Sequence, residues 1–152
     1  VGIDLLNLRS ALRDRIIHWL NVLRTRNVDR SVEVGPDFKV SFGGESSTSI
    51  DSSSTQTRVV LAMRTAAFEL AIQRNSRLPR FFILDTPRQQ DIAREDLAEY
   101  MRAVFEMAGQ FGAQVVCSTT NQRYELGSND VEWQPQFPGA EQPMFLGIAD
   151  AS

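Results

Sequence analysis

The chain is poor in several residue types, and each shortage excludes a kind of protein. Its 152 residues include a single cysteine, Cys117, and a single histidine, His18. One cysteine cannot form an internal disulfide or a multi-cysteine metal site, and it is compatible with a reducing, cytoplasmic setting. No apolar run approaches the roughly 20 residues that a membrane-spanning helix needs, so we expect no membrane as a partner.

Lysine is also nearly absent, and this limits how the chain can bind a nucleotide. Lys39 is the only lysine, and the other cations are arginines. The phosphate-binding loop GxxxxGK[ST] needs a lysine after a glycine-rich turn, and the residues around Lys39 do not match it. If the chain has a nucleotide-binding fold, this loop must come from another segment. The formal net charge of -3 argues against a dedicated nucleic-acid-binding module, because such modules are usually strongly basic.

The first part of the chain has the pattern of an amphipathic helix. Apolar residues recur at steps of three and four between Leu5 and Leu23, with arginines and acids on the other positions. Because this spacing is close to a heptad repeat, the segment is either a helix on a globular core or the root of a coiled coil. We expect residues 1–30 to form a coiled-coil root and residues 31–152 to form a globular lobe. The helical pattern is already under way at the first residues, so we also expect the chain to be part of a longer protein.

Two short segments that follow predict a β-hairpin. Residues 31–34 and 38–42 alternate between apolar and polar side chains, and the sequence Gly35-Pro36-Asp37 between them is typical of a turn.

A serine-rich segment, residues 43–55, then leads into an apolar sequence from Val59 to Phe68. The apolar sequence predicts a buried helix. Serine hydroxyls and free backbone N–H groups at a helix start can bind an anion, but ordinary helix capping also explains the serines.

A strand, a helix and a second strand are predicted next. Residues 81–84 are apolar and end in Asp85, residues 93–108 carry a helical stripe, and residues 114–118 form a second apolar run. The short connections indicate a βαβ unit with buried, parallel strands. Residues 144–146 indicate a short closing strand or an irregular tail. Trp133 is either a core side chain under this tail or an interface anchor, and we expect the core position.

This order of segments resembles the second half of ABC-type ATPase heads, found in structural-maintenance-of-chromosomes proteins and the related double-strand-break repair ATPases. The resemblance covers roughly residues 38–121. Residues 51–55 fall where the family has its signature motif LSGGQ, and residues 81–85 match its Walker B strand. Residues 89–91 lie where the family has its D-loop, and residues 114–120 match the strand that ends at the switch residue.

The resemblance implies an α/β fold class, namely the C-terminal half of a P-loop ATPase head. Mainly parallel strands flanked by helices would form this lobe, together with the N-terminal coiled-coil root helix and the β-hairpin. The partners implied are an N-terminal lobe with the Walker A loop, from the same gene or a separate chain, and a second head in a dimer. DNA is implied as a partner by the resemblance alone.

The resemblance also implies roles for individual residues, with ATP and Mg²⁺ as cofactors. Asp85 would bind Mg²⁺ and act in catalysis, with Thr86 next to it. The residues that would contact nucleotide are the signature residues together with one D-loop and one switch residue: Ser52, Ser53, Ser54, Thr55, Asp91 and Thr120. ATP would then join two heads, since the signature segment of each completes the phosphate site of the other.

The sequence departs from the family pattern at three places. Ser53 and Ser54 replace the signature glycines, which allow the backbone to approach phosphate closely. Thr86 stands where the family has its catalytic glutamate, and threonine cannot act as a general base near neutral pH. The switch histidine is also missing, since Thr120 or Asn121 occupies its position. Glu95 and Asp96 lie nearby in sequence, but the helix dipole favours acids in a first turn in any case.

Three hypotheses follow. The first is an ATP-binding and ATP-hydrolysing head of a coiled-coil ATPase in DNA maintenance, repair or antiviral defence, which is incomplete without the Walker A lobe. The second is a nucleotide-gated dimerisation module with little or no hydrolysis, for which Thr86 is the main support. The third is a βαβ interaction domain that binds no nucleotide.

Overall fold

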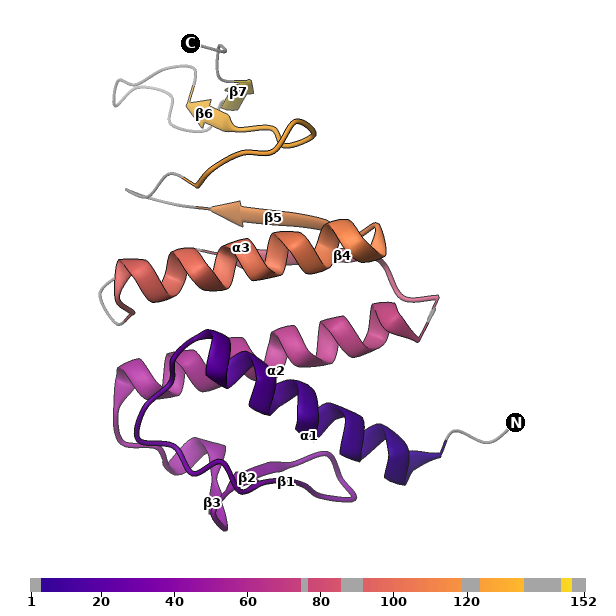
Figure 1. Ribbon diagram of the computed structural model, residues 1–152, viewed down its shortest axis with the longest axis vertical. Coiled ribbons are helices and arrows are strands. Elements are labelled where there is room, and N and C mark those ends of the chain that lie inside the picture. Colours follow the sequence, from indigo (N-terminus) through magenta and orange to yellow (C-terminus); the bar gives the residue numbers. More distant parts are fainter. Residues whose placement is uncertain (1–3, 75–76, 86–91, 119–123, 136–145, 149–152) are drawn as a thin grey trace. The chain divides into compact units, whose positions relative to one another are not determined.

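The computed structural model describes residues 4–74, 77–85, 92–118, 124–135 and 146–148. The chain divides into two compact units, Val1–Asn121 and Gln122–Ser152. Each unit is described by itself. In the described residues, the fold is α/β, with helices α1, α2 and α3 and small sheets (Figure 1).

Helix α1 spans Leu5–Val22 and confirms the helix that the sequence predicts. Its start is capped by the Asp4 side chain, which accepts hydrogen bonds from the backbone N–H groups of Leu6 and Asn7. Burial increases along the helix: Leu5 is exposed, whereas Ile16 and Trp19 are buried. Only the second half of α1 therefore belongs to the core of the unit.

The predicted hairpin is confirmed by strands β1 (Val32–Val34) and β2 (Val40–Phe42), which pair antiparallel. A short third strand, β3 (Glu45–Ser46), pairs antiparallel with β2. Valine and phenylalanine side chains of β1 and β2 point inward, and the residues between them are less buried, as the period of two in a strand requires. Gly43 adopts a φ of +58° at the turn into β3, a backbone conformation that glycine adopts without strain.

Helix α2, Ser53–Gln73, follows the 3-10 turn η1 (Ser47–Ser49). The buried helix predicted within this range is confirmed, and its exposed positions include Val60, Arg64 and Ala67. Helix α1 packs against α2 (Figure 1). A polar contact joins them inside the core, where the indole Nε1 of Trp19 donates to Glu69 Oε2 at 2.8 Å.

The predicted βαβ unit is confirmed as β4 (Phe81–Asp85), α3 (Arg94–Phe111) and β5 (Gln114–Ser118), with β4 and β5 parallel. Helix α3 ends at Gly112, whose φ of 61° is in the left-handed region that favours glycine at a helix end. The prediction that both strands are buried was wrong. Ile83 is 61% exposed and Val116 is 44% exposed, because the described part of unit Val1–Asn121 covers only one face of this pair.

The second unit contains a two-stranded antiparallel sheet of β6 (Trp133–Pro135) and β7 (Leu146–Ile148). A closing strand was predicted at residues 144–146. Leu146 begins β7, and the other two residues lie within 136–145, outside the described residues. The core position predicted for Trp133 was wrong, because its side chain is 58% exposed.

The expectation of mainly parallel strands was also wrong for the described residues. Parallel pairing is limited there to β4 and β5, and the other two sheets are antiparallel. The reason is local: hairpins pair strands that are adjacent in sequence, whereas a parallel pair needs a crossover such as α3.

Candidate functional site

The candidate site begins with two polar side chains at the carboxyl end of the parallel pair. Asp85 is the last residue of β4, Ser118 is the last residue of β5, and the two lie opposite each other in the sheet register. The Ser118 hydroxyl donates to Asp85 Oδ1 at 2.7 Å. Both residues are exposed. The carboxyl ends of parallel strands are the usual place for ligands in open α/β sheets, and Asp85 and Ser118 lie at such an end.

The same face of the pair carries exposed apolar side chains. Because side chains alternate between the faces of a strand, Phe81 and Ile83 share a face with Asp85 on β4, and Val116 shares it with Ser118 on β5. We call this surface, made of Phe81, Ile83, Val116, Asp85 and Ser118, the open face. Phe81 is 44% exposed and Ile83 is 61% exposed. The open face is therefore apolar in its middle and polar at the carboxyl ends of the strands. Gln114, exposed on the same face at the start of β5, is polar as well.

The opposite face of the pair is packed against the helices. Leu84 is buried. The ring of Phe82 stacks on Phe68 of α2, with ring centroids 4.7 Å apart. This packing fixes β4 against α2 and sets the direction in which Asp85 leaves the sheet.

Cys117 lies next to the site but is not suited to act as a nucleophile. Burial raises the pKa of its thiol to about 11, and the neighbouring charge of Asp85 adds to the effect. Because the thiolate is the reactive form of cysteine, Cys117 is protonated and unreactive near neutral pH.

The start of α2 is the second part of the candidate site. Ser52 is the N-cap residue, and its hydroxyl accepts from the backbone N–H of Thr55 at 3.5 Å. Ser52 and Ser53 are exposed, Ser54 is half-buried and Thr55 is only 6% exposed. The exposed residues at this helix start are thus Ser52 and Ser53, while Thr55 packs inward.

The two parts of the site belong to the same end of the unit. In Figure 1, β5 points toward the end at which α2 and α3 begin, and β4 runs parallel to β5. Three predicted site residues, Thr86, Asp91 and Thr120, lie outside the described residues.

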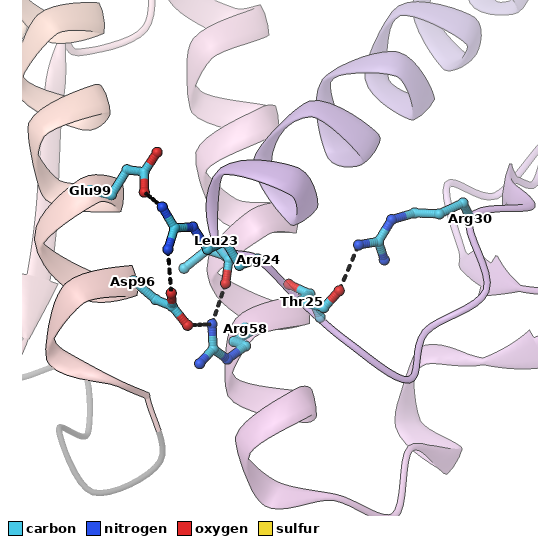
Figure 2. A network of polar contacts seen from close by, with 7 residues as sticks. All are labelled: Leu23, Arg24, Thr25, Arg30, Arg58, Asp96 and Glu99. Carbon is cyan, nitrogen blue, oxygen red and sulfur yellow. Dashed lines mark hydrogen bonds and ion pairs between the residues drawn. The ribbon is translucent and has the colours of Figure 1, made fainter.

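Three residues near the site were not singled out as functional by the sequence reasoning: Ser118, Arg58 and Arg24. Ser118 could have been found, because it ends the second apolar strand of a βαβ unit. The arginines meet around Asp96, at the start of α3 (Figure 2). Asp96 was assigned only to the helix dipole, since sequence periodicity does not show which residue of another helix it faces.

The oxygen donors at the carboxyl end fit a hard cation. Magnesium prefers oxygen ligands and is usually held by one or two carboxylates together with phosphates and water. Asp85 supplies a carboxylate, and Ser118 supplies a hydroxyl beside it. Within the described ranges, no three His, Cys, Asp or Glu side chains gather into a metal-binding group, so an all-protein metal cage is not found there.

Comparison with known proteins adds no relatives. No protein-family model, curated protein or solved structure matches the chain. Among the helices that the structure describes, none has the length and apolar character needed to cross a membrane.

Proposed function

We propose that this chain is the C-terminal lobe of an ABC-type ATPase head from a coiled-coil ATPase that acts in DNA maintenance, repair or antiviral defence. The lobe binds and hydrolyses ATP in the cytoplasm together with a segment that supplies the P-loop lysine. Two such heads associate around ATP. The observation that carries the proposal is the placement of Asp85 beside Ser118 at the carboxyl end of a parallel pair with an uncovered apolar face.

The open face supports the need for a second segment. Purely parallel sheets occur almost only where both faces are covered, and unpaired strand edges tend to recruit further strands. Ile83 and Val116 expose apolar surface that another layer would bury. A segment docked there would lie next to Asp85, where the P-loop of a complete head is needed.

The polar residues of the site suit phosphoryl transfer, which depends mostly on positioning and charge neutralisation. A bound magnesium ion would neutralise charge on the phosphates. Asp85 would orient that ion, and the Ser118 hydroxyl would hold the Asp85 carboxylate in place by its hydrogen bond. Ser52 and the first N–H groups of α2 would contact the phosphate of a nucleotide bound to the second head.

The burial of α1 supports the coiled-coil root. Leu5 and Leu6 are exposed at the beginning of the helix, whereas Trp19 and Leu20 are buried near its end. A helix that buries only its second half has an apolar stripe in its first half that a partner helix can cover. The DNA-related role rests on the family resemblance alone.

A nucleotide-gated dimerisation module is the second candidate, and one feature favours it. Thr86 follows Asp85 where the family has a glutamate, and a threonine hydroxyl does not accept a proton near neutral pH. If no other carboxylate or positioned water replaces the glutamate, the head binds ATP and dimerises but turns it over slowly.

The test uses the assembled head, meaning this chain together with the segment that carries its P-loop. We expect Mg·ATP to convert assembled heads into dimers, measured by light scattering after size-exclusion chromatography. Asp85→Ala should abolish this conversion, whereas Asp14→Ala, at an exposed aspartate on α1, should leave it unchanged. Dimers that form equally well with Asp85→Ala would refute the proposal. Fast turnover by the wild-type head would exclude the second candidate.

A further inference from the structure

Asp96 stands at the centre of a polar network that joins three helices (Figure 2). Its Oδ2 atom lies 2.8 Å from Nη1 of Arg58, which belongs to α2. Its Oδ1 atom lies 3.7 Å from Nη1 of Arg24, which follows the end of α1. The Arg58 guanidinium also donates to the backbone carbonyl of Leu23, the C-cap residue of α1. The network therefore fixes the end of α1, the second turn of α2 and the first turn of α3 to one another.

The inner and outer arms of the network differ in burial. Arg58 is 9% exposed, and the Asp96 side chain is 16% exposed. Arg24 has a side chain that is 56% exposed, and it has a further partner in Glu99, with Nη2 and Oε2 2.6 Å apart. The Arg58–Asp96 pair is thus the inner contact between α2 and α3, and Arg24 covers it from the solvent side.

Stability alone does not account for a largely buried pair of this kind. Removing two charges from water is costly, and replacing a buried ion pair by apolar residues of similar volume often leaves a protein equally or more stable. The pair does impose geometry, because a single nitrogen, Nη1 of Arg58, makes both the contact to Asp96 and the hydrogen bond to the Leu23 carbonyl. Here one guanidinium binds a carboxylate of α3 and a carbonyl at the end of α1, so the positions of both are set by Arg58.

The helix starts that this pair fixes are those that flank the candidate site. Arg58 lies in α2, which begins directly after Ser52, and Asp96 lies in the first turn of α3, the next helix after Asp85. A second buried contact between the same helices, Thr65 Oγ1 to Tyr100 OH at 2.6 Å, lies further along both. Two contacts spaced along a pair of helices prevent them from sliding or rotating against each other.

We propose that Arg58 and Asp96 are positioning residues that hold the start of α2 in register with the start of α3. The Ser52 helix start would then meet a second head in one fixed orientation. This inference rests on the proposed function. It predicts that loss of the pair impairs nucleotide-dependent association of heads more than it impairs folding or ATP binding by a single head.

The test compares variants of the assembled head in three measurements: urea unfolding, Mg·ATP binding and Mg·ATP-dependent dimerisation. The double variant Arg58→Met/Asp96→Leu replaces the pair by apolar side chains of similar volume. Arg58→Lys keeps a cation opposite Asp96 but replaces the rigid guanidinium by a flexible side chain, and it serves if the double variant does not fold. Arg13→Met/Asp14→Leu removes an exposed ion pair of α1 and is the matched control.

We expect the double variant to unfold at a moderately lower urea midpoint, because the buried Leu23 carbonyl loses its donor, and Arg58→Lys to unfold closer to the wild type. Both variants should still bind Mg·ATP as the wild type does. The Mg·ATP concentration needed for dimerisation should rise on the order of tenfold to a hundredfold, as for misplaced positioning groups in other systems. The control should leave it unchanged. Wild-type dimerisation behaviour in both the double variant and Arg58→Lys would overturn this inference alone. A wild-type head that does not dimerise with Mg·ATP would overturn the proposed function, and this inference with it.

Discussion

The buried hydrogen bond between Thr65 and Tyr100 gives a prediction whose size can be worked from the structure. Both residues are fully buried. The Thr65 hydroxyl donates its one hydrogen to the Leu61 carbonyl at 2.8 Å, so in the contact at 2.6 Å the Tyr100 O–H is the donor and Thr65 Oγ1 the acceptor. Removing the Thr65 hydroxyl and removing the Tyr100 hydroxyl should therefore lower the unfolding free energy by different amounts.

Thr65→Val leaves the Tyr100 O–H buried without its acceptor. An unsatisfied buried polar group costs about 1–3 kcal/mol, and we expect a loss of about 2 kcal/mol. Tyr100→Phe removes the donor, but the Thr65 hydroxyl keeps its bond to Leu61, so the expected loss is the net value of one hydrogen bond, about 1 kcal/mol. In the double variant both polar groups are gone, and its loss should be smaller than the sum by about 1 kcal/mol.

Urea unfolding followed by far-UV circular dichroism measures these differences. Tryptophan fluorescence is a second probe, recorded in a Trp133→Phe background so that it reports Trp19, whose ring packs edge-on against Tyr100 at 5.8 Å. Equal slopes of unfolding free energy against urea would show that the variants differ in stability alone. The reasoning is refuted if Thr65→Val costs no more than Tyr100→Phe, or if the two losses simply add.

Three further predictions concern single positions. Ile83→Ser should change the unfolding free energy of the chain by less than about 0.5 kcal/mol, because the side chain is 61% exposed. The same substitution should weaken binding of the chain to the P-loop segment in a pull-down titration. Unchanged binding would show that the open face is not the contact. The pKa of Cys117 is raised to about 11 from an ordinary 9.0, so the folded state favours the protonated thiol, and the unfolding free energy should fall as the pH rises from about 9 to about 11. In urea titrations across this pH range, Cys117→Ala should lack this part of the fall. A pH profile identical to that of the wild type would contradict the assignment. Glu69→Leu should lower the unfolding free energy, measured by heat or urea, by about 2–3 kcal/mol, because it leaves the buried Trp19 N–H without its acceptor. An unchanged unfolding free energy would show that this hydrogen bond contributes little to stability.

Local patterns in the sequence predicted the secondary structure well. The helical stripe from Leu5 to Leu23 became α1, the Gly35-Pro36-Asp37 turn became the hairpin, and the apolar runs ending at Asp85 and Ser118 became a parallel pair around α3. Each of these elements is determined by the spacing of apolar residues and by turn residues within the segment itself.

The burial of β4 and β5 could not be predicted in the same way. An apolar run such as that of Phe81 and Ile83 indicates that a strand is suited to be covered on both faces, but it does not say whether the same chain supplies the cover. The open face is where the local pattern and the described fold disagree. Under the proposed function this disagreement marks the surface that meets the P-loop segment.

The Arg58–Asp96 pair was missed for a related reason. An arginine within an apolar helix is usually read as a surface residue that extends to water. In α2, however, Arg58 lies on the same buried face as Thr65 and Glu69, which also have polar partners inside the core, Tyr100 and Trp19. Such pairings between distant segments depend on how the helices pack, and the period of one helix carries no information about its neighbour.

The placement of Asp85 at a nucleotide-bound metal can be measured directly by substituting Mn²⁺ for Mg²⁺ in the assembled head. With this chain isotopically labelled, Mn·ATP should broaden the NMR signals of the Asp85 carboxyl and of Ser118 strongly, while Mg·ATP leaves them sharp and the signal of Asp14 on α1 broadens little. If the Asp85 signal broadens no more than that of Asp14, the carboxylate does not lie at the metal, and the proposed ATPase site is wrong.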